Sequence, residues 1–148
     1  MLRGVVAILL ACLVHAGTFE EICEQNGFRY EEHTVTTKDG YILTVFRIPG
    51  KKNEIDFAEK PPVLFQHGIY SSADTWIMNH VEKAPAFVAA IAGYDVWLGN
   101  SRGNKYSKKH TTLNAEKDKA KYWDFDWVEM GLQDLPAVLD MITDKTGY

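Results

Sequence analysis

A strand, a helix and a second strand follow one another between residues 63 and 98, and this order constrains the fold more than any other feature. Val63–Phe65 is a short apolar run, typical of a buried strand, and Tyr94–Leu98 is a second such run. Between them, Pro85 suits the first turn of a helix that ends at Gly93. The helix carries an apolar stripe, made of Phe87, Val88 and Ile91. Strands joined by a helical crossover pair in parallel, so the sequence predicts the α/β class.

An antiparallel hairpin is predicted before this unit. Glu31–Thr37 and Tyr41–Ile48 are rich in Thr, Val, Ile and aromatic residues, and Asp39-Gly40 between them is a tight-turn signature. Upstream, Phe19–Cys23 fits a short amphipathic helical turn that Asn26-Gly27 closes. Residues 49–62 are polar and charged, with Gly and Pro near the ends, which predicts a surface connection. The sheet is therefore expected to be mixed, with helices on its faces.

A last helix is predicted after residue 126. Asp126 followed by Glu129 resembles a capping box, and Pro136 is expected to kink the helix that follows. The apolar residues of this segment fall on one helical face: Val128, Leu132, Leu135, Leu139 and Ile142. The stretch Asn100–Lys121 before it is too long for a bare connection, which makes it a candidate binding loop.

Charge and composition indicate an ordinary globular domain that does not bind nucleic acid. The 148 residues suit one domain, and 46% of them are hydrophobic and 24% charged, so disorder is not expected. The 16 basic and 20 acidic residues give a net charge of −4 and are spread along the chain. The short cluster of Lys105, Lys108 and Lys109 fits a solvated loop face. No extended basic patch is present, and nucleic-acid binding requires one.

The first sixteen residues have the pattern of a signal peptide. Arg3 supplies a positive charge, Val5–Val14 is an apolar core too short to span a bilayer, and Val14-His15-Ala16 is a small-residue cleavage pattern. We therefore expect residues 1–16 to be removed and residues 17–148 to form the folded domain, in a secreted or lysosomal protein. Cys12 would be lost with the signal, leaving Cys23 either as a small buried residue or as half of a pair with a cysteine outside these residues.

Gln66-His67-Gly68-Ile69 follows the first strand of the parallel unit and opens a polar loop. A buried strand that ends in His-Gly before a loop supplies one backbone N–H of the oxyanion hole in α/β-hydrolases. His67, Gly68 and the amide of Ile69 are therefore the candidate catalytic residues. We interpret His67 as an organiser of this loop, with a role as a base as the alternative.

A catalytic triad, a metal site and a cofactor site are not predicted from these residues. No Gly-x-Ser-x-Gly sequence occurs, and the loop serines are interpreted as turn residues: Ser71, Ser72, Ser101 and Ser107. No pair of His or Cys residues has metal-ligand spacing. Tryptophans are more often core than substrate-contacting residues, although Trp76 is a candidate for the mouth of an acyl pocket.

Several segments together resemble the N-terminal part of the acid lipases, the family of gastric and lysosomal lipases. The resemblance runs from about Glu20 to Tyr148, and its segments occur in the family's order: Asp39–Leu43, Arg47–Pro49, Gln66–Gly68, Ala73–Trp76, Gly93–Asn104, Tyr122–Phe125 and Asp134–Pro136. It implies the N-terminal half of an α/β-hydrolase sheet, incomplete in these residues, with Ile69 giving one oxyanion-hole donor. The second donor and the Ser, Asp and His of the triad would lie beyond Tyr148.

Two functions are consistent with the sequence. The first is an N-terminal fragment of a lipase that hydrolyses triacylglycerols or sterol esters, inactive alone and using no cofactor. The second is a truncated, non-catalytic lipase-like protein that binds a lipid or a partner through apolar surface. The resemblance also implies that the missing nucleophile strand would pair with Val63–Phe65. A peripheral contact of the protein with a lipid interface is a further expectation. The oligomeric state is left open.

Overall fold

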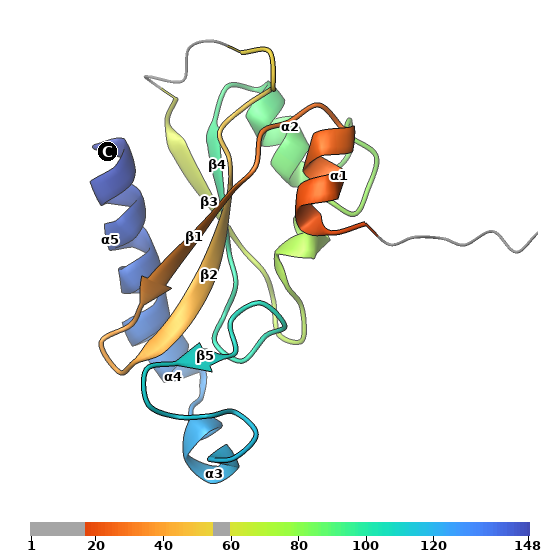
Figure 1. Cartoon of the computed structure of the whole chain (residues 1–148). Coiled ribbons are helices and arrows are strands. Elements are labelled where there is room, and N and C mark those ends of the chain that lie inside the picture. Colours follow the sequence, from red (N-terminus) through yellow and green to blue (C-terminus); the bar gives the residue numbers. More distant parts are fainter. Residues whose placement is uncertain (1–16, 55–59) are drawn as a thin grey trace, which may run out of the picture.

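The computed structural model describes residues 17–54 and 60–148, and its centre is one mixed sheet (Figure 1). Four strands lie in the order β1-β2-β4-β3, and a short fifth strand pairs with β2. Their bounds are β1 Glu31–Thr36, β2 Tyr41–Ile48, β3 Pro62–Gln66, β4 Asp95–Gly99 and β5 Lys109–His110. The predicted signal peptide and residues 55–59 of the predicted surface connection lie outside the described residues.

The predicted hairpin is confirmed. β1 and β2 pair antiparallel, with Val35 opposite Leu43. Gly40 has a φ of 99°, and an added Cβ there would lie 2.6 Å from Thr111 Oγ1. Only glycine combines that backbone conformation with so close a neighbour, because every other residue carries a Cβ. Glycine is therefore required at position 40 both by the turn and by the close approach of His110 and Thr111.

The predicted parallel unit is also confirmed. β3 pairs in parallel with β4, with Val63 opposite Val96, and helix α2 (Pro85–Ile91) connects them. β4 in turn pairs antiparallel with β2, so the hairpin and the parallel unit form one sheet. Within the described residues β3 pairs with β4 alone, so its other edge is free of strand partners.

Helix α2 buries a different face from the predicted one. Phe87 is buried, but Val88 and Ile91 are 44% and 50% exposed, and the other buried positions are Ala86 and Ala90. The ring of Phe87 stacks on that of Phe28, with 4.6 Å between centroids. The small alanines let the helix backbone approach the sheet closely, so the larger aliphatic residues are on the outer side.

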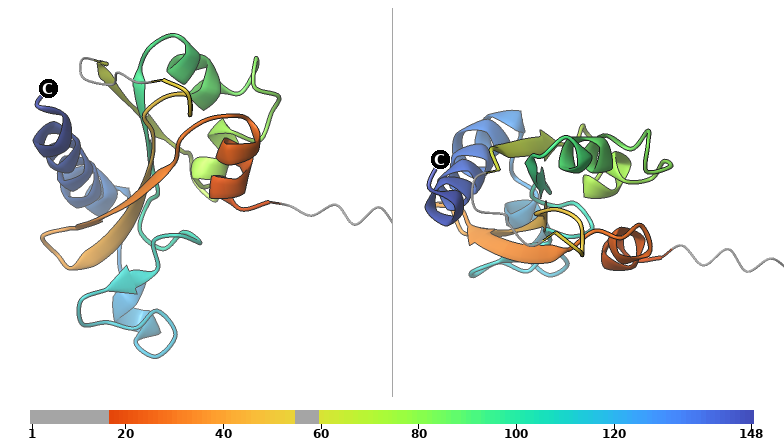
Figure 2. Two further views of the ribbon diagram at one scale, coloured as in Figure 1. Left: turned by 45° about the horizontal axis from the view of Figure 1, so that its top comes forward. Right: turned by 90° about the horizontal axis from the view of Figure 1, so that it is seen from above.

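Alternate residues of the central strands build a core on each face of the sheet. Phe46 and Ile48 of β2 pack with the residues of α1 (Phe19–Gln25) and α2. Leu43 and Val45, on the other face, pack with Val138 of α5. Figures 1 and 2 show the same arrangement, with α1 and α2 on one side of the sheet and α5 on the other.

The predicted first helix is confirmed as α1, with a cap that was not predicted. The Thr18 side chain accepts a hydrogen bond from the Glu21 amide, and the Glu21 carboxylate accepts one from the Thr18 amide. Gly27 follows the helix with a φ of 79°. Cys23 is fully buried with a free thiol, which agrees with the interpretation as a small buried residue.

The C-terminal helical segment begins at the predicted capping box and then changes its periodicity. α4 (Trp127–Glu129) is followed by a π-helical turn, η2 (Met130–Asp134), and then by α5 (Leu135–Thr146). The Asp126 side chain accepts from the Val128 amide at 2.6 Å. Pro136 lies in the first turn of α5, where its missing N–H is tolerated, and the widened turn directly precedes it.

This π-helical turn puts Val128 and Leu132 out of register with α5, which explains part of an error in the predicted apolar face. A projection at 3.6 residues per turn fails where five residues form one wider turn. The buried residues of α5 are Val138 and Ile142. The other members of the predicted face are exposed: Val128, Leu132, Leu135 and Leu139.

The stretch predicted as a binding loop, Asn100–Lys121, contains β5 and the start of a short helix, α3 (Lys119–Tyr122). Its first part, residues 100–107 (the Asn100 loop), folds against Thr44 in the middle of β2 and against Gln66 at the end of β3. None of the helices formed by the described residues has the length and apolar character needed to span a bilayer.

Candidate functional site

A cavity of about 1070 Å³ opens where β3 and β4 end. The carboxyl ends of neighbouring parallel strands are the usual position of ligand sites in α/β sheets. Two loops form most of its wall: the His67 loop, residues 67–74, which follows β3, and the Asn100 loop, which follows β4. Residues 123–138 close the remaining side.

The amide of Ile69 is an unpaired backbone donor at this cavity. Ile69 lines the cavity and is 61% exposed, and in residues 17–54 and 60–148 its N–H donates no hydrogen bond. Tyr70 next to it has a φ of 58°, a left-handed conformation that is uncommon for a tyrosine. The Ser71 amide donates to the Gly68 carbonyl at 3.3 Å, which closes the turn. The turn thus leaves the Ile69 amide available to a ligand at the cavity.

The ring of His67 connects the two loops. Its Nε2 accepts a hydrogen bond from the Ser101 amide at 3.1 Å, and its Nδ1 lies 2.8 Å from the Gly68 carbonyl oxygen. A backbone amide can only donate, so Nε2 is the unprotonated nitrogen and Nδ1–H donates to Gly68. Both ring nitrogens are therefore engaged within the protein, an arrangement suited to the predicted organiser rather than to a base.

Buried polar residues of the Asn100 loop hold this arrangement in place. Asn100 is 1% exposed, and its Oδ1 accepts from the Ala73 amide at 3.0 Å, while its Nδ2 donates to the Thr44 carbonyl at 3.1 Å. Ser107, fully buried, accepts from the Thr44 amide and donates to the Asn100 carbonyl. The sequence motif contains these residues, but their partners are distant in the chain, and motif spacing alone did not assign them a role.

Asp74 makes a second connection between the two loops. It accepts from the Tyr106 hydroxyl at 2.7 Å and from the Ser72 hydroxyl at 2.9 Å, and it forms an ion pair with Lys105. Burial raises the pKa of Asp74, but the hydrogen bonds from Lys105, Tyr106 and Ser72 outweigh it and hold the pKa below its usual range. The carboxylate is therefore charged over most of the pH scale, and the His67 loop is attached at both ends.

Arg102 lies beneath the cavity in a buried charge cluster. Its side chain is 1% exposed and donates to Asp134 at 2.7 and 2.8 Å and to Asp39 at 2.6 and 3.0 Å. Burial raises the pKa of Asp39, but the bonds from Arg102 and Thr37 prevail and lower it below its usual range. In the more deeply buried Asp134, burial prevails and the pKa is raised. The Arg102 guanidinium makes its hydrogen bonds to these two carboxylates, so we assign its charge a role in stabilising the fold.

The rim of the cavity is apolar. Several large side chains that line it are strongly exposed: Ile69, Tyr70, Met78 and Trp127. Trp127 is 71% exposed, whereas the predicted substrate-contacting Trp76 lies outside the lining. Trp76 packs against Phe65, with ring centroids 5.1 Å apart, and its indole N–H has no partner in the part of the chain that the structure describes. The tryptophan at the rim thus belongs to the last helical segment.

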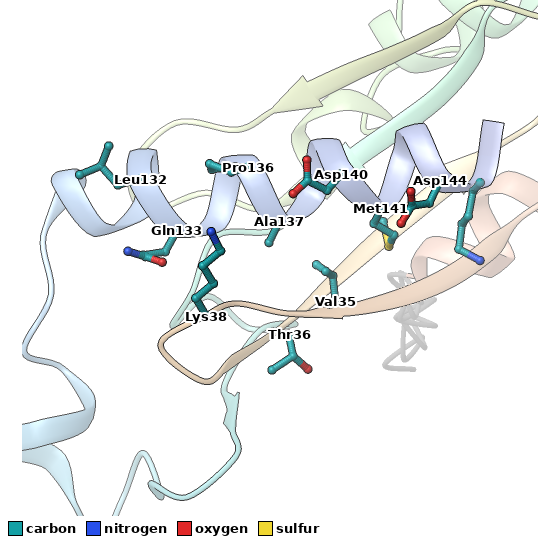
Figure 3. Close-up of a pocket in the computed structure, with 11 residues that line it drawn as sticks. Val35, Thr36, Lys38, Leu132, Gln133, Pro136, Ala137, Asp140, Met141 and Asp144 are labelled. Carbon is teal, nitrogen blue, oxygen red and sulfur yellow. The ribbon is translucent and has the colours of Figure 1, made fainter. Parts of the chain in front are cut away.

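A second cavity, of about 510 Å³, lies between β1 and the η2–α5 helix (Figure 3). In the close-up, Val35 and Lys38 of the hairpin point toward the helix, while Thr36 points away from it. Asp140 and Asp144 of α5 also line this cavity. It brings together neither a nucleophile with a base nor, among the described residues, three potential metal ligands.

Comparisons with known proteins agree with this geometry. A family model described as a partial α/β-hydrolase lipase region matches residues 19–80, and one described as the α/β-hydrolase fold matches residues 61–148. The chain is 46% identical over 128 residues to the lysosomal acid lipase/cholesteryl ester hydrolase of Homo sapiens, which covers 86% of this chain and 32% of that protein. It is 48% identical to the gastric triacylglycerol lipase of Mus musculus and 50% identical to lipase member K of Homo sapiens, each over 122 residues, 82% of this chain and 30% of those proteins.

The chain thus spans about a third of the length of these relatives. The family-model match to the α/β-hydrolase fold covers more than half of the chain, and the mixed sheet has the expected order of antiparallel and parallel strands. The resemblance to the acid lipases is confirmed, and the chain belongs to the α/β-hydrolase fold family.

Proposed function

We propose that these residues supply the oxyanion-hole loop of a serine lipase that hydrolyses carboxylic esters of lipids. The observation that carries the proposal is the unpaired amide of Ile69, which lies at a cavity between the ends of two parallel strands. The Ser, Asp and His of the triad and the second oxyanion donor are assigned to sequence beyond residue 148. On this proposal the chain is the N-terminal part of a longer enzyme.

The Ile69 amide would act on the tetrahedral intermediate of ester cleavage. Attack of a serine oxygen on the ester carbonyl forms a bond to carbon and moves an electron pair onto the carbonyl oxygen. A fixed N–H stabilises that negative charge without reorganising, and loss of one such donor lowers kcat by about 10²–10³-fold. Collapse of the intermediate expels the alcohol and leaves an acyl-enzyme, which water then hydrolyses. The residues described here need no cofactor for this role.

A lipid ester is the substrate class that the cavity favours. Its rim carries exposed apolar and aromatic side chains, among them Tyr70, Met78 and Trp127, which would contact acyl chains or the surface of a lipid aggregate. The relatives named for triacylglycerols and cholesteryl esters support the same class. We also propose that residues 1–16 are a signal peptide, which would direct the protein to secretion or to a lysosome.

A pair of substitutions in the full-length protein tests the role of the Ile69 amide. Ile69→Pro removes the N–H, and Ile69→Ala keeps it while removing most of the side chain. We expect Ile69→Pro to lower kcat on an emulsified triacylglycerol by about 10²-fold or more, and Ile69→Ala to keep kcat within about tenfold of the unsubstituted enzyme. Thermal unfolding of each variant reports whether the fold is retained.

Two outcomes would count against the proposal. Equal kcat values for a folded Ile69→Pro variant and the unsubstituted enzyme would remove the amide from the mechanism. If the full-length protein bound lipid vesicles but hydrolysed no ester, the protein would instead be a non-catalytic lipase-like binding protein.

A further inference from the structure

We infer that Asn104 is a positioning residue for the oxyanion hole: its side-chain amide fixes His67 as the Nδ1–H tautomer, and His67 in turn sets the direction of the Ile69 N–H. The inference rests on the proposed function for its catalytic consequence. The structural relationship itself is independent of that function. It depends on three links: two follow from groups that can only donate hydrogen bonds, and the third follows from the planarity of a peptide group.

The first link is the orientation of the Asn104 side chain. Its Oδ1 accepts from two backbone amides, those of Tyr106 at 2.9 Å and Ser107 at 3.1 Å. Because these partners can only donate, the oxygen must face them and the Nδ2 must face the other way. Nδ2 then lies 2.8 Å from Asn100 Oδ1 and 3.1 Å from His67 Nε2.

The second link is the tautomer of His67. Nε2 is approached by two donors, the Asn104 Nδ2 and the Ser101 amide, both at 3.1 Å. A nitrogen that faces two donors must offer its lone pair, so the ring proton is on Nδ1. Nδ1–H accordingly donates to the Gly68 carbonyl oxygen at 2.8 Å. Ser101 alone would favour the same tautomer, and Asn104 adds a donor from a side chain that is itself held on both sides.

The third link is the peptide group between Gly68 and Ile69. The Gly68 carbonyl and the Ile69 N–H belong to one planar group, and the described residues contain no cis peptide bond. In a trans peptide the carbonyl oxygen and the N–H point in opposite directions. A hydrogen bond that holds the Gly68 oxygen toward His67 therefore directs the Ile69 N–H away from His67. It also polarises that N–H, because hydrogen bonds at the two ends of a peptide group strengthen each other.

Asn104→Asp isolates the donor function of Asn104. The remaining oxygen still accepts from the Tyr106 and Ser107 amides, but an oxygen that cannot donate now faces His67 Nε2 and Asn100 Oδ1. This change favours a proton on Nε2 and displaces the Ser101 amide from its acceptor. Asn79→Asp is the matched control, since Asn79 is exposed, lies outside the cavity, and also accepts a backbone amide, that of His80, through Oδ1.

The first measurement is the tautomer of His67 in the full-length protein, from long-range ¹H–¹⁵N correlation spectra of the histidine rings. In the unsubstituted protein and in Asn79→Asp we expect protonated Nδ1 and unprotonated Nε2, and in Asn104→Asp a protonated Nε2. A protonated Nε2 in the unsubstituted protein at neutral pH would overturn the inference without any substitution. An unchanged ring in a folded Asn104→Asp variant would overturn it as well.

The second measurement is ester hydrolysis by the same proteins. We expect Asn104→Asp to lower kcat by about tenfold or more with KM within about threefold, because the donor acts on the transition state rather than on the bound substrate. Asn79→Asp should match the unsubstituted enzyme. A shift of the His67 tautomer with unchanged kcat would refute the positioning role. If the spectra agree but the unsubstituted protein hydrolyses no ester, the proposed function fails while the link from Asn104 to the peptide stands.

Discussion

The guanidinium carbon of Arg102 lies 3.9 Å from the centroid of the Tyr41 ring. The cation thus stacks on an aromatic residue of β2 while it donates to carboxylates of the hairpin turn and of the last helical segment. One side chain therefore joins three segments beneath the candidate site. The Arg102 and Asp134 side chains are 1% and 8% exposed, so removing Arg102 leaves the buried Asp134 carboxylate without compensation.

Arg102→Met is expected to destabilise the protein strongly. The substitution leaves Asp134 buried without its cation, and the loss of one partner of a buried pair typically costs about 3–5 kcal/mol of unfolding free energy. Chemical denaturation measures the change. Lys119→Met, which removes an exposed pair with Glu116, is the control and should cost less than about 1 kcal/mol. Similar losses for the two variants would contradict the structural role of Arg102.

Asp39 predicts a specific pH dependence of stability. Its pKa is lower in the folded protein than in the unfolded chain, so its stabilisation is complete above the unfolded pKa of about 3.9 and is lost as the pH falls through the folded value. Asp39→Asn removes this contribution. The difference in unfolding free energy between the unsubstituted protein and this variant should therefore be larger at pH 6 than at pH 2. A difference that does not change with pH would rule this effect out.

Gly103 and Gly131 are expected to respond in opposite directions to alanine. Gly103 has a φ of 81°, and an added Cβ would lie 2.5 Å from the Trp123 ring, so Gly103→Ala should destabilise by about 1–3 kcal/mol. Gly131 is helical and nothing lies within 4 Å of its added Cβ, so Gly131→Ala should stabilise by about 0.5–1 kcal/mol. Thermal unfolding of both variants measures the contrast. Destabilisation by both substitutions would contradict the stabilisation expected from Gly131→Ala.

Cys23 is expected to resist thiol reagents in the folded state. Burial, with added repulsion from Glu20 and Glu24, raises the pKa of its thiol to about 12, so the reactive thiolate is scarce at neutral pH. Mass spectrometry after brief alkylation should find the peptide containing Cys23 unmodified, and fully modified when denaturant is added first. Rapid modification without denaturant would contradict its burial.

Residues 18–148 produced alone are expected to be poorly soluble and inactive on ester substrates. Among residues 18–54 and 60–148 one edge of β3 has no strand partner, and Leu132 and Leu139 are exposed on the last helical segment. Both features favour aggregation. Replacing both leucines with lysine should increase the soluble fraction recovered after centrifugation. A soluble monomer of the unsubstituted segment with cooperative unfolding would defeat this prediction.

Local signals predicted most of the fold. Asp39-Gly40 indicates the hairpin turn, and Pro85 with Gly93 indicates the helix of the parallel unit, because each signal concerns a conformation that few residues adopt. The buried faces of the helices were harder to predict. Val88 lies outward because the alanines of α2 are buried in its place, and Val128 and Leu132 are out of register with α5 because a π-helical turn separates them from it. Neither effect can be read from a regular period.

Only those residues of the candidate site that belong to a recognisable sequence motif were predicted. His67 and Ile69 follow from the His-Gly sequence after a strand, and the structure places both at the cavity. The residues that hold His67 are 34 and 37 positions away, at Ser101 and Asn104, so no local pattern could pair them with it. Trp76, the candidate for the mouth of an acyl pocket, packs on Phe65 and is outside the cavity lining, whereas Trp127 lies at the rim.

The charge cluster around Arg102 also constrains the order in which the chain folds. Arg102 is bonded to a residue 63 positions earlier and to one 32 positions later. During synthesis the hairpin turn is therefore complete long before its cation has been added, and the cation is added before its second carboxylate. Closing such long loops costs entropy before the contacts can compensate. The hairpin can thus form early as a local unit, but the ion cluster that joins its turn to the last helical segment is complete only once Asp134 has been added.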